Sequence, residues 1–269
     1  MNKLIYIIEL IYRRLLKYNL KLIINNLVSR NKLEESSEYK KIVDELKNNG
    51  YAKIEGFLSQ EKCKEIINIV DIYLKENNDK IWKDDNNNCD LRLFGAEKID
   101  KLINEYYNNE KILKIGNLYI KSSLKNIFTL AGKTSFVEKD NFGSGGGWHR
   151  DSINPSFKSM LYLTDVNSGD GNLQIIEESN KFKTIIKFNS KINKKLLNTR
   201  FKNDEVDYLI KKFDLKIKDI YGKAGSLVLF DGSYIHKGTP VVNSTRYALT
   251  NYFYLDIDVK KAKYPSPMI

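Results

Sequence analysis

The chain has 269 residues, of which 42% are hydrophobic and 12% aromatic. This length can bury a full core, and the aromatic content excludes a disordered protein. The 45 basic and 34 acidic residues give a formal net charge of +11, which favours acidic partners. No basic stretch interleaved with aromatic residues accompanies that charge, so we expect an anionic small molecule or lipid headgroup as partner, and no nucleic acid.

The first 36 residues form a basic segment rich in Leu and Ile. Arg13, Arg14, Lys17 and Lys21 interrupt the apolar residues, so no run reaches the roughly 20 residues that a membrane-spanning helix needs. The small-residue cleavage site of a signal peptide is also missing. We predict an amphipathic helix that either packs on the domain or on another subunit, or makes peripheral contact with a membrane through residues 1–30.

Cysteine is scarce, with only Cys63 and Cys89 in the chain. Two cysteines are too few for a disulfide framework in a protein of this size, and too few for a cysteine-based zinc or iron–sulfur site. We therefore expect a reducing, cytoplasmic setting, with the membrane surface as the alternative that the N-terminal segment leaves open.

Residues 37–269 begin with a helix, a strand and a helix, and continue as short strands. Apolar residues at helical spacing predict helices over Glu38–Leu46, from Ser59 onwards, over Ile99–Ile115 and around Asp204–Phe213. The predicted strands are Tyr51–Ile54, Ser135–Asp140, Phe157–Val166, Asn172–Ile176, Ser226–Phe230 and Tyr247–Leu255. With no repeat and no Pro- or Gly-rich linker, the pattern predicts one mainly β domain, a jelly roll of two facing sheets with helices packed outside.

The two histidines of the chain, His149 and His236, have informative neighbours. Alternate residues of a strand project to the same face, so His149 and Asp151 can reach one point while Arg150 turns away. His236 would complete a set of three ligands that leaves the other coordination positions open. This is the 2-His-1-carboxylate arrangement of non-haem Fe(II) oxygenases, although zinc or manganese accepts the same ligands.

Arg246 follows His236 by ten residues and lies on or just before the last predicted strand. A planar guanidinium can bind a carboxylate through two parallel hydrogen bonds. Placed beside the metal, Arg246 would hold the far carboxylate of 2-oxoglutarate while the keto-acid end chelates the iron. A hydrolytic zinc site has no need of such a residue, so Arg246 favours an oxygenase, with a structural ion pair as the competing interpretation.

Several motifs together resemble the phytanoyl-CoA dioxygenase family, from about residue 38 to the end of the chain. In order they are NNGYAKIEGFLSQEKC, GGGWHRDS, KSMLYLTDV, GDGNLQIIEESNK, AGSLVLFDGSYIHKG and the Arg246 segment. The resemblance implies a double-stranded β-helix (cupin-like) fold, iron bound by His149, Asp151 and His236, and 2-oxoglutarate bound by Arg246. Because Asp151 is present, it also implies hydroxylation, with O2 as oxidant and succinate and CO2 as products, and no halogenation.

The resemblance is less informative about secondary contacts to the co-substrate. Family members often carry a hydroxyl just after the distal histidine, but position 238 here is glycine. Thr239, Lys158 and Thr164 are the remaining candidates. Basic residues such as Arg150 and Lys158 favour an anionic substrate, for example a lipid, a sugar conjugate or an acyl conjugate.

Two other classes of function fit the same sequence features. A jelly-roll binding module without activity would keep the fold, and a metal-dependent hydrolase or isomerase could use the same His/Asp/His set. Production of succinate separates the dioxygenase from the binding module, and a requirement for O2 separates it from the hydrolase. The oligomeric state stays open.

Overall fold

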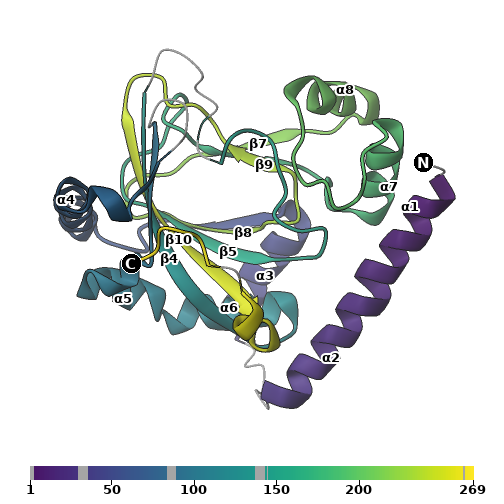
Figure 1. Ribbon diagram of the computed structural model, residues 1–269, viewed down its shortest axis with the longest axis horizontal. Helices are drawn as coiled ribbons and strands as arrows, with labels where there is room; N and C mark the ends of the chain where they lie inside the picture. The colour runs from purple at the N-terminus through teal and green to yellow at the C-terminus, as the bar shows by residue number, and fades with distance from the viewer. Residues whose placement is uncertain (1–2, 30–35, 84–88, 137–142, 144, 263) are drawn as a thin grey trace.

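The computed structural model describes residues 3–29, 36–83, 89–136, 143, 145–262 and 264–269 (Figure 1). Its core is a double-stranded β-helix made of a seven-stranded and a three-stranded antiparallel sheet. The large sheet has the order β1(Tyr51–Ile54), β8(Leu227–Asp231), β5(Phe157–Tyr162), β10(Thr245–Leu255), β4(Leu124–Ser135), β3(Asp90–Phe94), β2(Trp82–Lys83). The small sheet has the order β7(Ile217–Ile220), β6(Leu173–Ile176), β9(His236–Gly238). The fold predicted from the sequence is confirmed.

Helices cover the outer face of the large sheet, and their apolar side chains form the largest hydrophobic cluster with it. These helices are α3(Ser37–Asn49), α4(Gln60–Glu76), α5(Lys101–Tyr107) and α6(Glu110–Ile120). The packing is close, because a Cβ added to Gly116 would lie 2.6 Å from the Phe157 ring. A second cluster, which includes Tyr162, Leu173 and Phe230, fills part of the space between the two sheets. The rest of that space is a cavity lined by both polar and apolar residues.

The remaining helical segments lie at the ends and edges of the sheets. They are α7(Phe182–Lys191), α8(Asn203–Phe213) and the short 3-10 turns η2(Asn78–Lys80), η3(Ala96–Lys98) and η4(Asp256–Lys261). The predicted helical insertion is confirmed by α8. The sequence pattern did not indicate α7, which begins at Phe182 without a side-chain cap.

A long N-terminal helix runs along the outside of the molecule (Figure 1). It consists of α1(Lys3–Leu10), a π-helical stretch η1(Ile11–Lys17) and α2(Tyr18–Ser29). Residues 1–2 and 30–35 of the predicted 1–36 segment lie outside the described residues. Among the helices that the structure describes, none combines the length and apolarity needed to cross a bilayer.

Two sequence predictions for individual elements were wrong. The helix expected over Ile99–Ile115 is two helices, because Asn109 caps the start of α6 by accepting a hydrogen bond from the backbone N–H of Ile112. The strand expected over Ser135–Asp140 lies earlier, as β4, which ends at Ser135. Residues 137–140 of that prediction lie outside the described part of the chain.

Candidate active site

His149, Asp151 and His236 meet at one point between the two sheets. One ligand atom from each residue lies within 4.8 Å of the others. The Nε2 atoms of His149 and His236 are 3.9 Å and 3.8 Å from the Asp151 carboxylate oxygens. Within the described part of the chain, this is the group of His, Cys, Asp and Glu side chains that could hold a metal ion.

Backbone pairing between distant segments positions the three side chains. His149 and His236 form an antiparallel bridge in which each N–H donates to the other carbonyl, at 2.9 Å and 2.8 Å. The N–H of Asp151 donates to the carbonyl of Gly232. The spacing of His149 and Asp151 suggested a regular strand, but the two residues do not lie in one. An isolated bridge and one loop hydrogen bond achieve the same convergence.

Both imidazole rings are oriented by their second nitrogen. Nδ1 of His149 bonds the carbonyl of Gly147, and Nδ1 of His236 bonds the carbonyl of Tyr234, each at 2.9 Å. As the donor in such a bond, Nδ1 carries the proton and Nε2 is free to bind a metal. Burial, with a contribution from His236, lowers the pKa of His149 to about 3, and burial also lowers the pKa of His236. Both rings are neutral at pH 7, as ligands must be.

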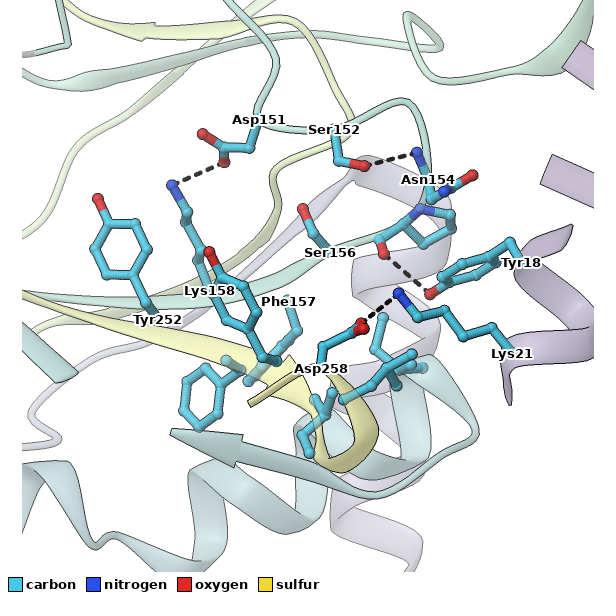
Figure 2. A pocket seen from close by; sticks show the side chains of 16 residues that line it. Tyr18, Lys21, Asp151, Ser152, Asn154, Ser156, Phe157, Lys158, Tyr252 and Asp258 are labelled. Atoms are coloured by element: carbon cyan, nitrogen blue, oxygen red, sulfur yellow. Dashed lines mark hydrogen bonds and ion pairs between the residues drawn. The ribbon is translucent and has the colours of Figure 1, made fainter. Parts of the chain in front are cut away.

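Lys158 on β5 forms an ion pair with Asp151, with 2.8 Å between Nζ and Oδ2 (Figure 2). Burial would raise the pKa of Asp151, but Lys158 and the two histidines outweigh it and lower this pKa to about 2. Burial would lower the pKa of Lys158, but the negative charge of Asp151 outweighs this effect and raises that pKa. Lys158 thus keeps the acidic ligand ionised, and its ammonium also lies 4.3 Å from the centre of the Tyr252 ring.

A cavity of about 220 Å³ joins this group to Arg246. Arg246 is 4% exposed, and its guanidinium donates to the carbonyl of Gly171 and to Thr134 Oγ1. Among the described residues its Nε has no hydrogen-bond partner. Unsatisfied buried donors are rare in native proteins, and a bound ion, a water or a catalytic role can account for this one. The wall also carries basic Arg92, Lys158 and Arg200. The cavity therefore suits a small anion that reaches from the metal position to Arg246.

The other sequence candidates lie elsewhere. Neither Thr239 nor Thr164 is among the described residues that line this cavity. The Thr239 hydroxyl donates to Asn172 Oδ1, and Thr164 Oγ1 accepts from the N–H of Tyr247. Arg150 is buried and turned away, with its guanidinium over the Phe201 ring. The sequence suggested that Arg150 and Lys158 both lie near the site, and of these two residues only Lys158 lines the cavity.

A larger cavity of about 400 Å³ shares Asp151, Lys158 and Tyr252 with the first one. Figure 2 shows its polar wall, where Tyr18 and Lys21 of α2 point inwards beside Asp258. This volume is in the usual range for a small-molecule site. The N-terminal helix therefore forms part of the wall of a cavity that extends to the candidate metal ligands.

The sequence did not indicate a role for Asp231. Asp231 is fully buried at the end of β8 and accepts hydrogen bonds from the Tyr119 hydroxyl and from the N–H of Ser156 and Ser233. These bonds fix the loop after Asp151 and the loop before His236 together. The sequence carries no signal for this role beyond its nearness to His236.

Tyr252 and Arg92 were also missed. Tyr252 shares the inward face of β10 with Arg246, since residues two apart in a strand point the same way. The alternation along that strand could have revealed it. Arg92 reaches the cavity from β3, which no sequence pattern indicated.

The sequence model of the phytanoyl-CoA dioxygenase family matches residues 46–247, and the chain belongs to this family. No protein of curated function matches the chain in sequence.

Similar solved structures have the fold of Fe- and 2-oxoglutarate-dependent enzymes. One is the epimerase SnoN in complex with Fe3+, alpha ketoglutarate and nogalamycin RO, with a TM-score of 0.61, 13% identity, and coverage of 81% of this chain and 84% of that one. Another is HygX from Streptomyces hygroscopicus with nickel, 2-oxoglutarate and hygromycin B bound, with a TM-score of 0.55, 11% identity, and coverage of 82% of this chain and 88% of that one. A third is EctD from S. alaskensis with bound Fe, with a TM-score of 0.57, 12% identity, and coverage of 83% of this chain and 78% of that one. At these identities the likeness concerns the fold.

Proposed function

We propose that the chain is an Fe(II)- and 2-oxoglutarate-dependent dioxygenase that hydroxylates a small anionic organic molecule, such as a lipid, a sugar conjugate or an acyl conjugate. Residues 37–269 form the catalytic domain in this proposal, and residues 1–36 a helical segment attached to it. The observation that carries it is a basic cavity with the His149, Asp151 and His236 group and Arg246 in its wall, where the Arg246 Nε has no hydrogen-bond partner among the described residues.

The donor set fits iron. Two neutral imidazoles and one carboxylate occupy one face of a metal and leave positions for a chelating keto acid and for O2. Bound iron, 2-oxoglutarate and O2 would supply the oxidising chemistry, in which decarboxylation to succinate and CO2 is coupled to oxidation of a substrate C–H bond.

The side chains of the chain bind, orient and shield. Arg246 would pair with the far carboxylate of 2-oxoglutarate through charge-assisted hydrogen bonds, which its Nε is available to make. Lys158 keeps Asp151 ionised and correctly placed until the metal binds. The apolar residues Leu130, Met160, Leu173 and Phe230 close the cavity wall and limit water near the reacting atoms.

The larger cavity is the proposed substrate site. It adjoins Asp151, and its wall carries Tyr18 and Tyr252 as aromatic surfaces together with Lys21 and Lys158, which are ion-paired with Asp258 and Asp151 of the same wall. An anionic group of the substrate would bind these ammonium groups in competition with the two carboxylates, and its carbon skeleton would lie against the aromatic rings. Peripheral membrane contact through residues 1–30 is part of the proposal, because the same helix forms one wall.

Consumption of 2-oxoglutarate tests the proposal without knowledge of the substrate. The purified protein should form succinate slowly when Fe(II), 2-oxoglutarate and O2 are all supplied, and Arg246→Met should need at least about tenfold more 2-oxoglutarate, since a hydrogen bond to a charged group contributes about 1.5–3 kcal/mol. Absence of succinate from folded, iron-loaded protein with candidate anions present would contradict a dioxygenase and favour the binding module or the hydrolase.

The type of oxidation is tested by mass spectrometry of the product once a substrate is found. Hydroxylation adds one oxygen atom, ring closure removes two hydrogens, and epimerisation leaves the mass unchanged. We expect the added oxygen to come from O2, which labelling with the heavy isotope measures. A product without added oxygen would refute hydroxylation while leaving the cofactor assignment intact.

A further inference from the structure

The N-terminal helix has one packed face and one open face. Tyr6 and Leu10 are fully buried against α7 and its neighbours. Further along, the Tyr18 hydroxyl donates to the carbonyl of Pro155 at 3.0 Å, and Asn25 donates to Ser122 Oγ and to the carbonyl of Ser123, both at 2.8 Å. The helix is therefore attached to the domain along its whole length.

The opposite face is a continuous strip of large apolar side chains, each between 37% and 74% exposed, which we call the apolar strip. Its members are Leu4, Ile5, Ile8, Ile11, Tyr12, Leu15, Leu16, Leu20, Ile23, Ile24, Leu27 and Val28. Exposed apolar surface on this scale is unusual in a protein without a partner and marks an interaction site.

The π-helical stretch keeps the strip on one side. Residues that are buried or half-buried recur at 6, 10, 14, 18 and 22 and then at 25, so their mean spacing exceeds the 3.6 residues of an α-helical turn. Wider π turns within 11–17 absorb the excess, so the packed face and the apolar strip each stay aligned from Lys3 to Ser29. A straight α-helix would rotate the second half of the strip toward the protein.

The exposed charge beside the strip is positive. Lys3 and Lys17 are exposed there, and Arg13 is ion-paired with Glu9, the acidic residue between positions 3 and 29. Arg14 and Lys21 face the protein instead, where Arg14 donates to the carbonyl of Asn180 and Lys21 pairs with Asp258. The elements that contact the helix add exposed lysines at both ends. They are Lys183, Lys187 and Lys191 of α7, Lys121 beside Asn26, and Lys260 and Lys261 of η4.

We propose that the apolar strip docks the protein on the surface of a bilayer that contains anionic lipid. Amphipathic helices with basic flanks lie in the headgroup region with their apolar face in the acyl boundary. A second copy of the chain is the less suitable occupant, because it would bring two sets of these lysines, on chains of net charge +11, against each other.

Docking places the larger cavity just behind the membrane-facing helix, since Tyr18 and Lys21 on the packed side of that helix line it (Figure 2). An amphiphilic anionic substrate would be concentrated near that cavity; this step, unlike the docking, rests on the proposed function.

Flotation with lipid vesicles tests the docking without any turnover. The wild type should float with vesicles of equal parts phosphatidylcholine and phosphatidylglycerol, and bind phosphatidylcholine vesicles much less. The Leu16→Glu/Leu27→Glu double variant should lose at least about tenfold in partitioning, because each change removes an apolar anchor and adds a negative charge. The matched control is Ile72→Glu/Val242→Glu, since these side chains are 55% and 57% exposed elsewhere on the molecule and its binding should equal that of the wild type.

Three results would overturn the proposal. They are wild-type protein that does not float, a strip variant that floats as well as the control, and equal binding to phosphatidylcholine alone. Sedimentation of the same proteins identifies the competing occupant, because a wild-type dimer that the strip variant dissociates, without flotation, would assign the strip to a subunit interface. Iron and 2-oxoglutarate binding by the strip variant should be unchanged, which separates this test from that of the proposed function.

Discussion

The ligand rings of His149 and His236 depend on two backbone carbonyls for their orientation. These hydrogen bonds leave Nε2 of each ring directed at Asp151. The sequence could predict the three candidate ligands, because histidine is scarce and one histidine lies two residues from an aspartate. It could not predict the carbonyl partners, which the loop conformation sets.

The depressed pKa values of the two histidines should appear as a pH dependence of stability. The unfolded chain takes up protons as the pH falls through about 6.5, whereas burial keeps both rings neutral in the fold. Stability should therefore be lost as the pH falls from about 7 to about 5, by up to about 1.4 kcal/mol per pH unit for each histidine.

Urea unfolding of chelator-treated protein measures this slope. His149→Asn should show a shallower slope than the wild type, since it removes one of the two groups. A free energy of unfolding that is independent of pH over this range would show that the two rings titrate in the fold as they do in the unfolded chain.

Position 232 requires glycine because the Asp151 carboxylate occupies the space that a Cβ would need, and not because the backbone there has a conformation that favours glycine. A Cβ at this position would lie 2.2 Å from Asp151 Oδ2 and 2.7 Å from Ser156 Oγ. The carboxylate would rotate away at little cost to the fold, so Gly232→Ala should weaken metal binding by about 10–100-fold, the usual effect of disturbing the support of a ligand.

Titration calorimetry with Co(II) as a stable substitute for iron measures this effect. Gly132→Ala is the matched control, because its Cβ in the same cavity wall first meets Leu130 at 3.3 Å and touches no ligand. Equal metal affinity in the Gly232 variant and the control would remove the steric argument.

Among the elements, those defined by local capping were predictable. Ser59 caps α4, and Gly50 ends α3 with a φ of +85°, as the sequence indicated. β4 was not predictable, because it is a central strand whose pattern reflects its neighbours. It pairs with both β10 and β3, and its buried polar Thr129 is satisfied by Asn251 of β10. Such partners are invisible to local periodicity.

The role of the π-helical stretch Ile11–Lys17 in the register of the N-terminal helix can be tested by deleting residues from it. A π turn accommodates one extra residue in a helix, so deletion of Leu16 should restore regular α-helix while Tyr6 and Asn25 both keep their buried positions. Deletion of Leu15 and Leu16 together should rotate α2 by about 100° and withdraw Asn25 from its partners Ser122 and Ser123.

Thermal unfolding and limited proteolysis distinguish the two deletions. We expect the single deletion to resemble the wild type, and the double deletion to release the helix to protease, with a loss of at least about 1–3 kcal/mol for the buried amide groups left unpaired. Equal behaviour of the two variants would show that the stretch has no role in register.

At the scale of the molecule, the candidate active site joins parts of the chain that are far apart. His236 comes from the small sheet, Lys158 and Arg246 from the large sheet, and His149 and Asp151 from the segment before β5. The sequence predicted this assembly only through order and spacing. It could not place Tyr18 or Arg92, since these residues reach the cavities through tertiary packing alone.

The central claim is that this assembly binds iron and 2-oxoglutarate together. Anaerobic titration of the apoprotein with Fe(II) and then 2-oxoglutarate tests it most directly, through the weak visible charge-transfer band of the chelate. We expect the band to saturate at one equivalent of iron in the wild type and to be absent in His149→Ala. Folded wild-type protein without the band, indistinguishable from His149→Ala, would contradict the claim.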